Sequence, residues 1–177
     1  MPKLDTTSRL LVALNSGENL SRDSICKLAL RLDEWIISRD RPSDLGRAMG
    51  VPTREIEIAR LLVRDSDGRA EIQMDKARAA SLDILTIADD GYPALLRQLE
   101  LPPPVLYCRG RIPDIPSVAI VGSRRATPIG LEVAELFGRE LASCGLAVVS
   151  GFARGIDLAA HRGALSAGNG QTLAVLG

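Results

Sequence analysis

The chain has 177 residues, enough for one or two small domains, with 46% hydrophobic and 25% charged residues. This composition is ordinary for a globular protein that buries a core, and the aliphatic runs are too short to cross a bilayer. The 22 basic and 22 acidic side chains cancel, which argues against a broad basic surface that coats nucleic acid by charge alone.

Targeting and metal-binding signals are weak. The N-terminus lacks a basic segment followed by an apolar stretch and a cleavage pattern, so we expect a cytoplasmic protein. Cys26, Cys108 and Cys144 are far apart, and only His161 offers an imidazole. The sequence therefore predicts no metal site, no disulfide framework and no cofactor.

Residues 1–81 are predicted to form a small helical domain. Apolar residues recur at helical spacing in two runs, which are Leu10, Leu11 and Leu14, then Ile25, Leu28, Ala29 and Leu32. Ser21 is placed to cap the second helix, and Trp35 is expected in the core. Further helices are expected over 42–50, 52–63 and 67–81.

The stretch 44–56 fits two helices that meet at a turn at Gly50, which is the pattern of a helix-turn-helix motif. Its second helix, however, mixes acidic Glu55 and Glu57 with basic Arg60. Such a face is poorly suited to a groove lined with phosphates. We favour a helical bundle without a DNA role, and a helix-turn-helix remains the alternative.

Residues 82–116 are predicted to be a covering segment and linker. A strand is expected over 82–87, and a short helix from Pro93 through Leu99. Three consecutive prolines, 102–104, impose an extended chain because proline fixes φ and has no amide hydrogen to donate. A second strand follows over 105–108.

From Ser117 onwards the pattern is strand, helix, strand, helix, strand. The strands, over 117–121, 146–149 and 172–176, are continuous apolar runs of the kind that a parallel sheet buries on both faces. The helices are expected over 128–143 and 156–167, and the first carries an apolar stripe of Leu131, Ala134, Leu136 and Leu141. This alternation predicts an α/β fold with right-handed crossovers.

The first two of these strands each run into a glycine-bearing loop that opens a helix. The loops are 122–128 and 150–157, and parallel strands bring both to the carboxyl edge of the sheet, where such sheets bind ligands. Helix N-termini attract anions, and Arg124 and Arg154 add planar groups suited to phosphate oxygens. Thr127 is a plausible helix cap before Pro128. The sequence therefore predicts phosphate binding at this edge, but neither loop has the spacing of a dinucleotide fingerprint or a P-loop.

Several segments together resemble the DNA-processing protein A (DprA/Smf) family. Residues 117–124 resemble its strand and Gly-Ser-Arg loop, and 149–157 with 159–161 closely match its second signature. Residues 91–93 and 103–110 are similar to its lead-in segment. The helical part matches only in character, as the SAM-like or helix-turn-helix-like domain that many members carry.

The resemblance implies a Rossmann-like domain over 117–177, a parallel three-stranded βαβαβ unit that binds single-stranded DNA. It implies a non-enzymatic recombination mediator in DNA uptake and natural transformation (competence) that assists RecA loading. The family's DNA-binding positions correspond to Gly122, Ser123, Arg124, Ser150, Gly151, Arg154 and Gly155. Arg125 is added from its proximity. Members continue past the third strand, so the domain is truncated by comparison, and the surfaces for a homodimer and for RecA lie largely in the part that follows.

The remaining polar residues have alternative interpretations. Asp157 and His161 lie one helical turn apart, and we expect the carboxylate to hold a structural imidazole rather than form a catalytic pair. Phe152 either stacks on a base or packs against the sheet edge. An alternative function is a nucleotide-binding or nucleoside-monophosphate-hydrolysing Rossmann-like enzyme, although neither loop contains the glutamate that such chemistry needs. A third is an interaction domain with inactive loops.

Overall fold

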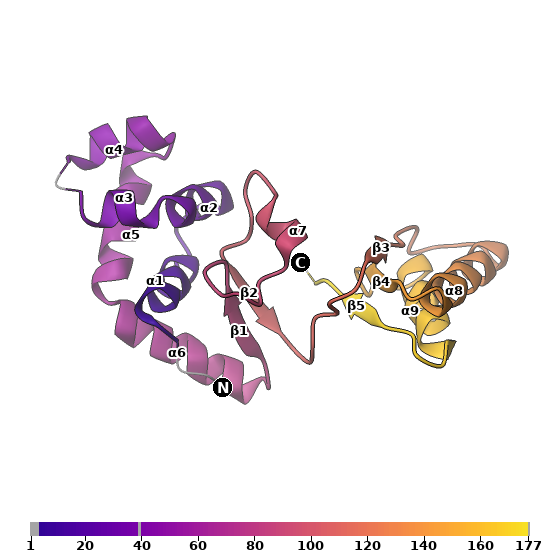
Figure 1. Cartoon of the computed structure of the whole chain (residues 1–177). Coiled ribbons are helices and arrows are strands. Elements are labelled where there is room, and N and C mark those ends of the chain that lie inside the picture. Colours follow the sequence, from indigo (N-terminus) through magenta and orange to yellow (C-terminus); the bar gives the residue numbers. More distant parts are fainter. Residues whose placement is uncertain (1–3, 39, 177) are drawn as a thin grey trace. The chain divides into compact units, whose positions relative to one another are not determined.

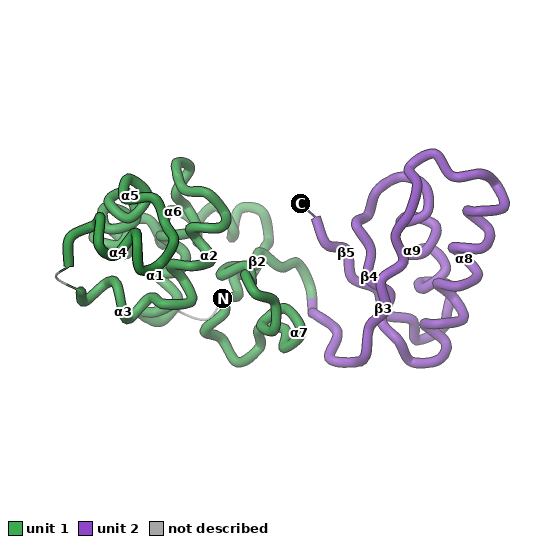
Figure 2. Tube along the Cα trace, turned by 90° about the horizontal axis from the view of Figure 1, so that it is seen from above, with its two compact units in different colours: residues 1–110 green, residues 111–177 purple. Residues whose placement is uncertain are grey.

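The computed structural model describes residues 4–38 and 40–176. Contacts within the chain divide it into two compact units, Met1–Gly110 and Arg111–Gly177, which Figure 2 colours separately. Each unit has its own hydrophobic core. The predicted division into a helical domain (1–81), a covering segment and linker (82–116) and a Rossmann-like domain (117–177) stays a prediction. Every helix within the described ranges is too short or too polar to span a bilayer.

The first unit opens with a series of helices, as the apolar spacing predicts (Figure 1). They are α1 (Thr6–Asn15), α2 (Arg22–Leu30), α3 (Leu32–Ile36), α4 (Pro42–Met49), α5 (Thr53–Arg64) and α6 (Ser66–Ala79). The hydroxyl oxygen of Ser21 accepts a hydrogen bond from the amide of Ser24 at 3.2 Å, which satisfies a donor in the first turn of α2. The predicted Ser21 cap is confirmed.

Large side chains fill the core of this unit. Trp35 is 0% exposed and shares the core with Leu28 and Ile56. Its indole N–H donates to the carbonyl oxygen of Leu28 at 2.8 Å, so the one polar atom of the ring is satisfied inside the core. Trp35 is therefore a core residue, as the sequence predicts.

The predicted pair of helices around Gly50 is formed by α4 and α5. Gly50 ends α4 in the left-handed region at φ 62°, a conformation that favours glycine. Glu55 on α5 accepts hydrogen bonds from the amide and hydroxyl of Ser21. Arg60 donates to the carbonyl oxygen of Asp40 at 3.0 Å. Because these charged side chains bind the unit's own backbone, the geometry favours the bundle interpretation over a groove-binding helix.

A two-stranded antiparallel sheet completes the first unit. The strands β1 (Asp83–Thr86) and β2 (Val105–Cys108) pair antiparallel, with α7 (Ala94–Arg97) between them in sequence. The hydroxyl oxygens of Thr86 and Ser8 lie 3.0 Å apart in a buried hydrogen bond, and Val105 joins the helical core. Both predicted strands are confirmed, whereas α7 ends two residues before Leu99.

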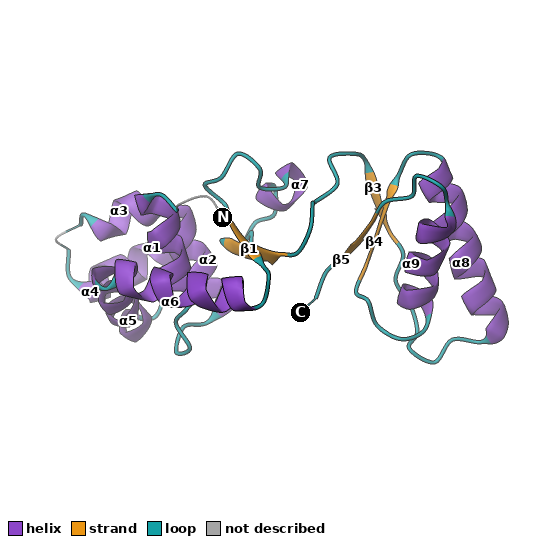
Figure 3. Ribbon diagram, turned by 90° about the horizontal axis from the view of Figure 1, so that it is seen from below, coloured by secondary structure: helices purple, strands orange, loops and turns teal. Residues whose placement is uncertain are grey.

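The second unit is a parallel βαβαβ arrangement, as predicted. Its elements are β3 (Ser117–Ala119), α8 (Pro128–Ser143), β4 (Ala147–Ser150), α9 (Ile156–Ser166) and β5 (Thr172–Ala174). The strand order is β3-β4-β5 and both pairings are parallel. Both helices lie against one face of this sheet (Figures 1 and 3), as successive right-handed crossovers require. β3 and β5 each end two residues earlier than predicted, although Ile120 and Val175 still donate one more hydrogen bond each to β4.

The contact between α8 and α9 is made by small residues. Ala134, Gly138 and Ala142 form the buried face of α8, and a side chain on Gly138 would collide with the carbonyl oxygen of Ala160 on α9. Leu136, predicted to face the core, is exposed. That part of the prediction is wrong because Leu136 lies two residues from both Ala134 and Gly138, on the opposite side of α8 from the buried face.

Candidate functional site

The two glycine-bearing loops lie next to each other at one edge of the parallel sheet. The first joins β3 to α8, the second joins β4 to α9, and the strands run in the same direction. The amide of Ile156, in the first turn of α9, donates to the carbonyl oxygen of Ser123 in the first loop at 3.2 Å. Gly155 also lies against the backbone of Ser123, where a side chain would collide. The predicted juxtaposition of the two loops is confirmed.

Asp157 connects the two loops. Its buried carboxylate accepts hydrogen bonds from the amide of Gly122 in the first loop, at 3.3 Å, and from the amide of Gly151 in the second, at 3.2 Å. The amide of Ala153 is a third donor at 3.4 Å. The amide hydrogens of Gly122 and Gly151 are therefore engaged within the chain, so a bound anion would have to use other loop amides.

The predicted contact between Asp157 and His161 is replaced by another. The Nδ1 atom of His161 lies 2.6 Å from the hydroxyl oxygen of Thr172, which itself donates to the carbonyl oxygen of Val148 at 2.7 Å. Because that hydroxyl has only one hydrogen, Nδ1 must be the donor. The expected Asp157–His161 hydrogen bond is wrong because converging loop amides take the carboxylate. Asp157 joins the loops, and His161 joins α9 to β5.

The ring of His161 is buried, and its Nε2 atom has no hydrogen-bond partner among the described residues. Burial lowers the pKa of His161 below its usual range, although the nearby Asp157 carboxylate partly opposes the shift. The ring of Phe152 lies 5.6 Å away, centroid to centroid. Phe152 itself has a positive φ of 58°, and its side chain is exposed at the loop.

The two loops carry three exposed arginines. Arg124 and Arg125 in the first loop and Arg154 in the second are all exposed. Across residues 4–38 and 40–176, the ion pairs and side-chain hydrogen bonds leave these three guanidinium groups without a partner. Their charge is therefore available to a ligand.

The two serines of the predicted site differ. Ser123 is exposed, and its hydroxyl oxygen accepts a hydrogen bond from the amide of Arg125 at 3.0 Å. Ser150 is buried, and its hydroxyl donates to the carbonyl oxygen of Ile120 at 2.6 Å. Ser150 thus connects β4 to the residue that follows β3, just before the first loop, and its hydroxyl hydrogen is already used.

The first helix begins as predicted. Thr127 caps α8 by accepting a hydrogen bond from the amide of Gly130 at 3.1 Å, and Pro128 occupies the first helical position. The sequence did not indicate Thr172 as a residue of the site. A threonine in an apolar run is typical of a strand, and nothing local marks it as the partner of an imidazole.

The chemistry available at this edge is anion binding. The described residues bring neither serine of the loops into hydrogen-bond contact with His161, so neither serine is paired with a base. Within the same ranges, no three His, Cys, Asp or Glu side chains gather closely enough to hold a metal ion. The arrangement is a pair of glycine-bearing loops that expose three arginines at one edge of a Rossmann-like domain.

Comparison with known proteins identifies the family to which this chain belongs. The model of the DNA recombination-mediator protein A family matches residues 83–177, which is more than half of the chain. The chain therefore belongs to this family, also known as DprA/Smf.

Individual relatives support the same family assignment. Protein Smf of Synechocystis sp. is 35% identical over 143 residues, covering 77% of this chain and 35% of that protein. DNA processing protein DprA of Streptococcus pneumoniae is 40% identical over 94 residues, covering 52% of this chain and 33% of that protein. The X-ray structure of the Streptococcus pneumoniae protein matches 99% of this chain and 58% of its own, with a TM-score of 0.63 and 27% identity. The chain thus spans about a third of the length of the curated relatives it matches.

Proposed function

We propose that this chain binds single-stranded DNA through its phosphates, and that the protein is a recombination mediator rather than an enzyme. The mediator acts in the cytoplasm during DNA uptake and natural transformation, assists the loading of RecA, and works as a homodimer. The phosphates are held by Arg124, Arg125 and Arg154, with Ser123 and the free amides of the two loops. Family membership supports the mediator role.

One observation carries the DNA-binding proposal. Two adjoining loops expose three guanidinium groups that the described part of the chain leaves unpaired. Each guanidinium offers a planar fork of donors that suits two phosphate oxygens. The chain has no net charge, so a local cluster of this kind is what a polyanion would need to bind here.

The geometry also supports a contact without base preference. The groups at this edge are cations and backbone amides, which read phosphates and not base edges. Phe152, exposed two residues before Arg154, offers a π-face that any base would suit. Affinity should therefore depend strongly on salt and weakly on sequence.

The test is fluorescence anisotropy with a labelled single-stranded oligonucleotide over a range of salt concentrations. Arg124→Ala and Arg154→Ala should each weaken binding to every sequence alike and lower the salt slope by about one. Arg162→Ala is the control, because Arg162 is an exposed arginine of the same unit on α9 and outside the loops. Equal affinity of the two loop variants and the native chain would contradict the proposal.

A further inference from the structure

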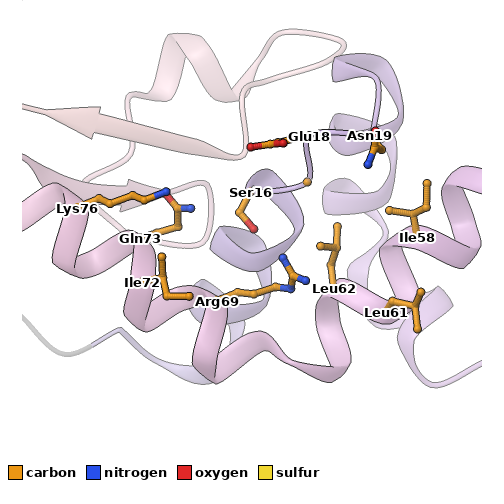
Figure 4. A pocket seen from close by; sticks show the side chains of 11 residues that line it. Ser16, Glu18, Asn19, Ile58, Leu61, Leu62, Arg69, Ile72, Gln73 and Lys76 are labelled. Atoms are coloured by element: carbon orange, nitrogen blue, oxygen red, sulfur yellow. The ribbon is translucent and has the colours of Figure 1, made fainter.

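The first unit contains a pocket that the proposed DNA site does not use. It has a volume of about 410 Å³ and lies between the turn after α1, the second half of α5 and the middle of α6 (Figure 4). Figure 4 labels the lining side chains, which come from these three segments. Its lining combines aliphatic and cationic groups, and this combination limits what can occupy it.

The aliphatic part comes from both helices. Leu61 on α5 is 62% exposed and Ile72 on α6 is 55% exposed, although both line the pocket. Leu62 also lines the pocket but is buried, and a side chain on Gly17 would collide with it. Two large aliphatic groups beside a hollow favour an apolar group that would displace water from them.

The cationic part comes from one face of α6. Arg69 and Lys76 both line the pocket and are about two helical turns apart, which places them about 10 Å from each other along the axis. The ion pair of Arg69 with Asp65 is long, at 3.7 Å, and the Nε atom of Arg69 has no hydrogen-bond partner in the described chain. Glu18 is the acidic residue among the lining groups.

The acidic residues of α6 form ion pairs outside the pocket. Asp67 and Glu71 pair with Arg9 at 3.2 and 3.8 Å, and Asp75 pairs with Arg78 at 2.7 Å. None of these lines the pocket. These three acids of α6 are therefore paired outside the pocket, whereas Lys76 and Arg69, whose ion pair with Asp65 is long, line it.

We propose that this pocket docks an acidic, amphipathic segment of a partner protein. An aliphatic side chain of the segment enters between Leu61 and Ile72, and carboxylates on either side of it meet Arg69 and Lys76. The separation of the two cations suits carboxylates spaced along a peptide better than the single head group of a fatty acid. Single-stranded DNA fits less well, because its phosphates would leave the aliphatic groups of the pocket uncovered.

The experiment selects peptides from a random displayed library on the full chain, then measures the enriched peptides by fluorescence anisotropy. We expect enriched sequences to combine leucine, isoleucine or valine with glutamate or aspartate. Lys76→Glu should weaken their binding by roughly tenfold, as expected for a lost favourable charge contact replaced by a repulsive one. Ile72→Ser, at an exposed position, should weaken it several-fold through lost apolar contact.

Arg78→Glu is the matched control. Arg78 lies with Lys76 in the last turn of α6 but outside the pocket, so both reversals disturb the helix dipole alike. Circular dichroism checks that each variant is folded. Affinity should be unchanged in Arg78→Glu.

The proposal is overturned if no peptide is enriched, if enriched peptides are basic, or if Lys76→Glu binds them as the native chain does. Competition separates the other occupants. A single-stranded oligonucleotide is added to the Arg124→Ala/Arg154→Ala chain, in which the loop site is weakened, and laurate is added to the native chain. Displacement of the peptide by either would assign the pocket to that ligand instead. An unaffected peptide supports the proposal.

Discussion

The two units of this chain build their cores from different kinds of side chain. The helical unit buries large groups, with Trp35, Leu11, Leu14 and Ile56 nearly or wholly inaccessible. The core cluster of the α/β unit consists of four alanines and one valine, with Ile120 packed against it. The first core is stabilised by apolar area removed from water, and the second by backbones brought close together. Substitutions should therefore act by opposite mechanisms in the two units, as cavities in one and as collisions in the other.

The largest expected effect is a cavity in the first core. Trp35→Ala should lower the free energy of unfolding by about 3–5 kcal/mol, because it removes a fully buried indole together with its hydrogen bond to Leu28. Urea unfolding followed by circular dichroism gives the change. Hydrogen exchange locates it, and protection should fall within the first unit while α8 and α9 keep theirs. Equal loss of protection in both units would show that the cores are not separate.

The second core should respond to an added methyl group. Gly138→Ala should destabilise by about 1–3 kcal/mol, because its Cβ would press on the backbone of Ala160. In a helix without such a contact, the same change stabilises by up to about 1 kcal/mol. The sign of the effect in urea unfolding is thus decisive.

Gly68→Ala provides the comparison in the helical unit. Gly68 lies in α6, where a new Cβ would meet only the flexible carboxylate of Asp65. We expect this change to be neutral or stabilising. If both glycine variants were stabilised, the contact between α8 and α9 would not be as close as described.

A smaller effect is expected at Asp157, whose carboxylate connects the two loops of the second unit. Asp157→Asn keeps one acceptor oxygen and places an N–H donor where the other was, so the amide of Gly122 or that of Gly151 must lose its partner. The cost should be about 1–2 kcal/mol. Amide exchange measured by NMR should accelerate in one loop more than in the other. Unchanged exchange at both glycines would argue that the carboxylate does not hold the loops together.

The elements of both units could be predicted because their signals are local. The bounds of α8 follow from Thr127 as a cap, Pro128 at the first helical position and Gly145 two residues after the last turn. The strand order followed from alternating apolar runs, since a parallel sheet leaves few ways to connect them. The edge at which the loops meet could be predicted for the same reason.

The internal contacts of the site could not be predicted, because they join residues far apart in sequence. Gly122 and Asp157 are 35 positions apart, and His161 and Thr172 are 11 apart on different elements. Helical spacing offered only the local pair of Asp157 and His161, which the folded chain does not use. The stripe of α8 failed similarly, because hydrophobicity favours Leu136 over Gly138, whereas close packing of helices selects the smaller residue.

The smallest effect concerns pH and depends on the burial of His161. Burial lowers the pKa of His161 in the folded chain, so the unfolded chain binds the proton more tightly. The free energy of unfolding should therefore fall as the pH drops below about 6.5, by at most about 1.4 kcal/mol per pH unit, and level off below the folded pKa. The sequence contains one histidine, so His161→Gln should flatten this part of the pH profile measured by urea unfolding. Thr172→Val, which removes the acceptor of the Nδ1 hydrogen but keeps the imidazole, should lower stability while preserving the pH dependence. A native profile as flat as that of the glutamine variant would mean that the imidazole is accessible to water. The second unit would then be packed less closely around α9 and β5 than the burial of His161 indicates.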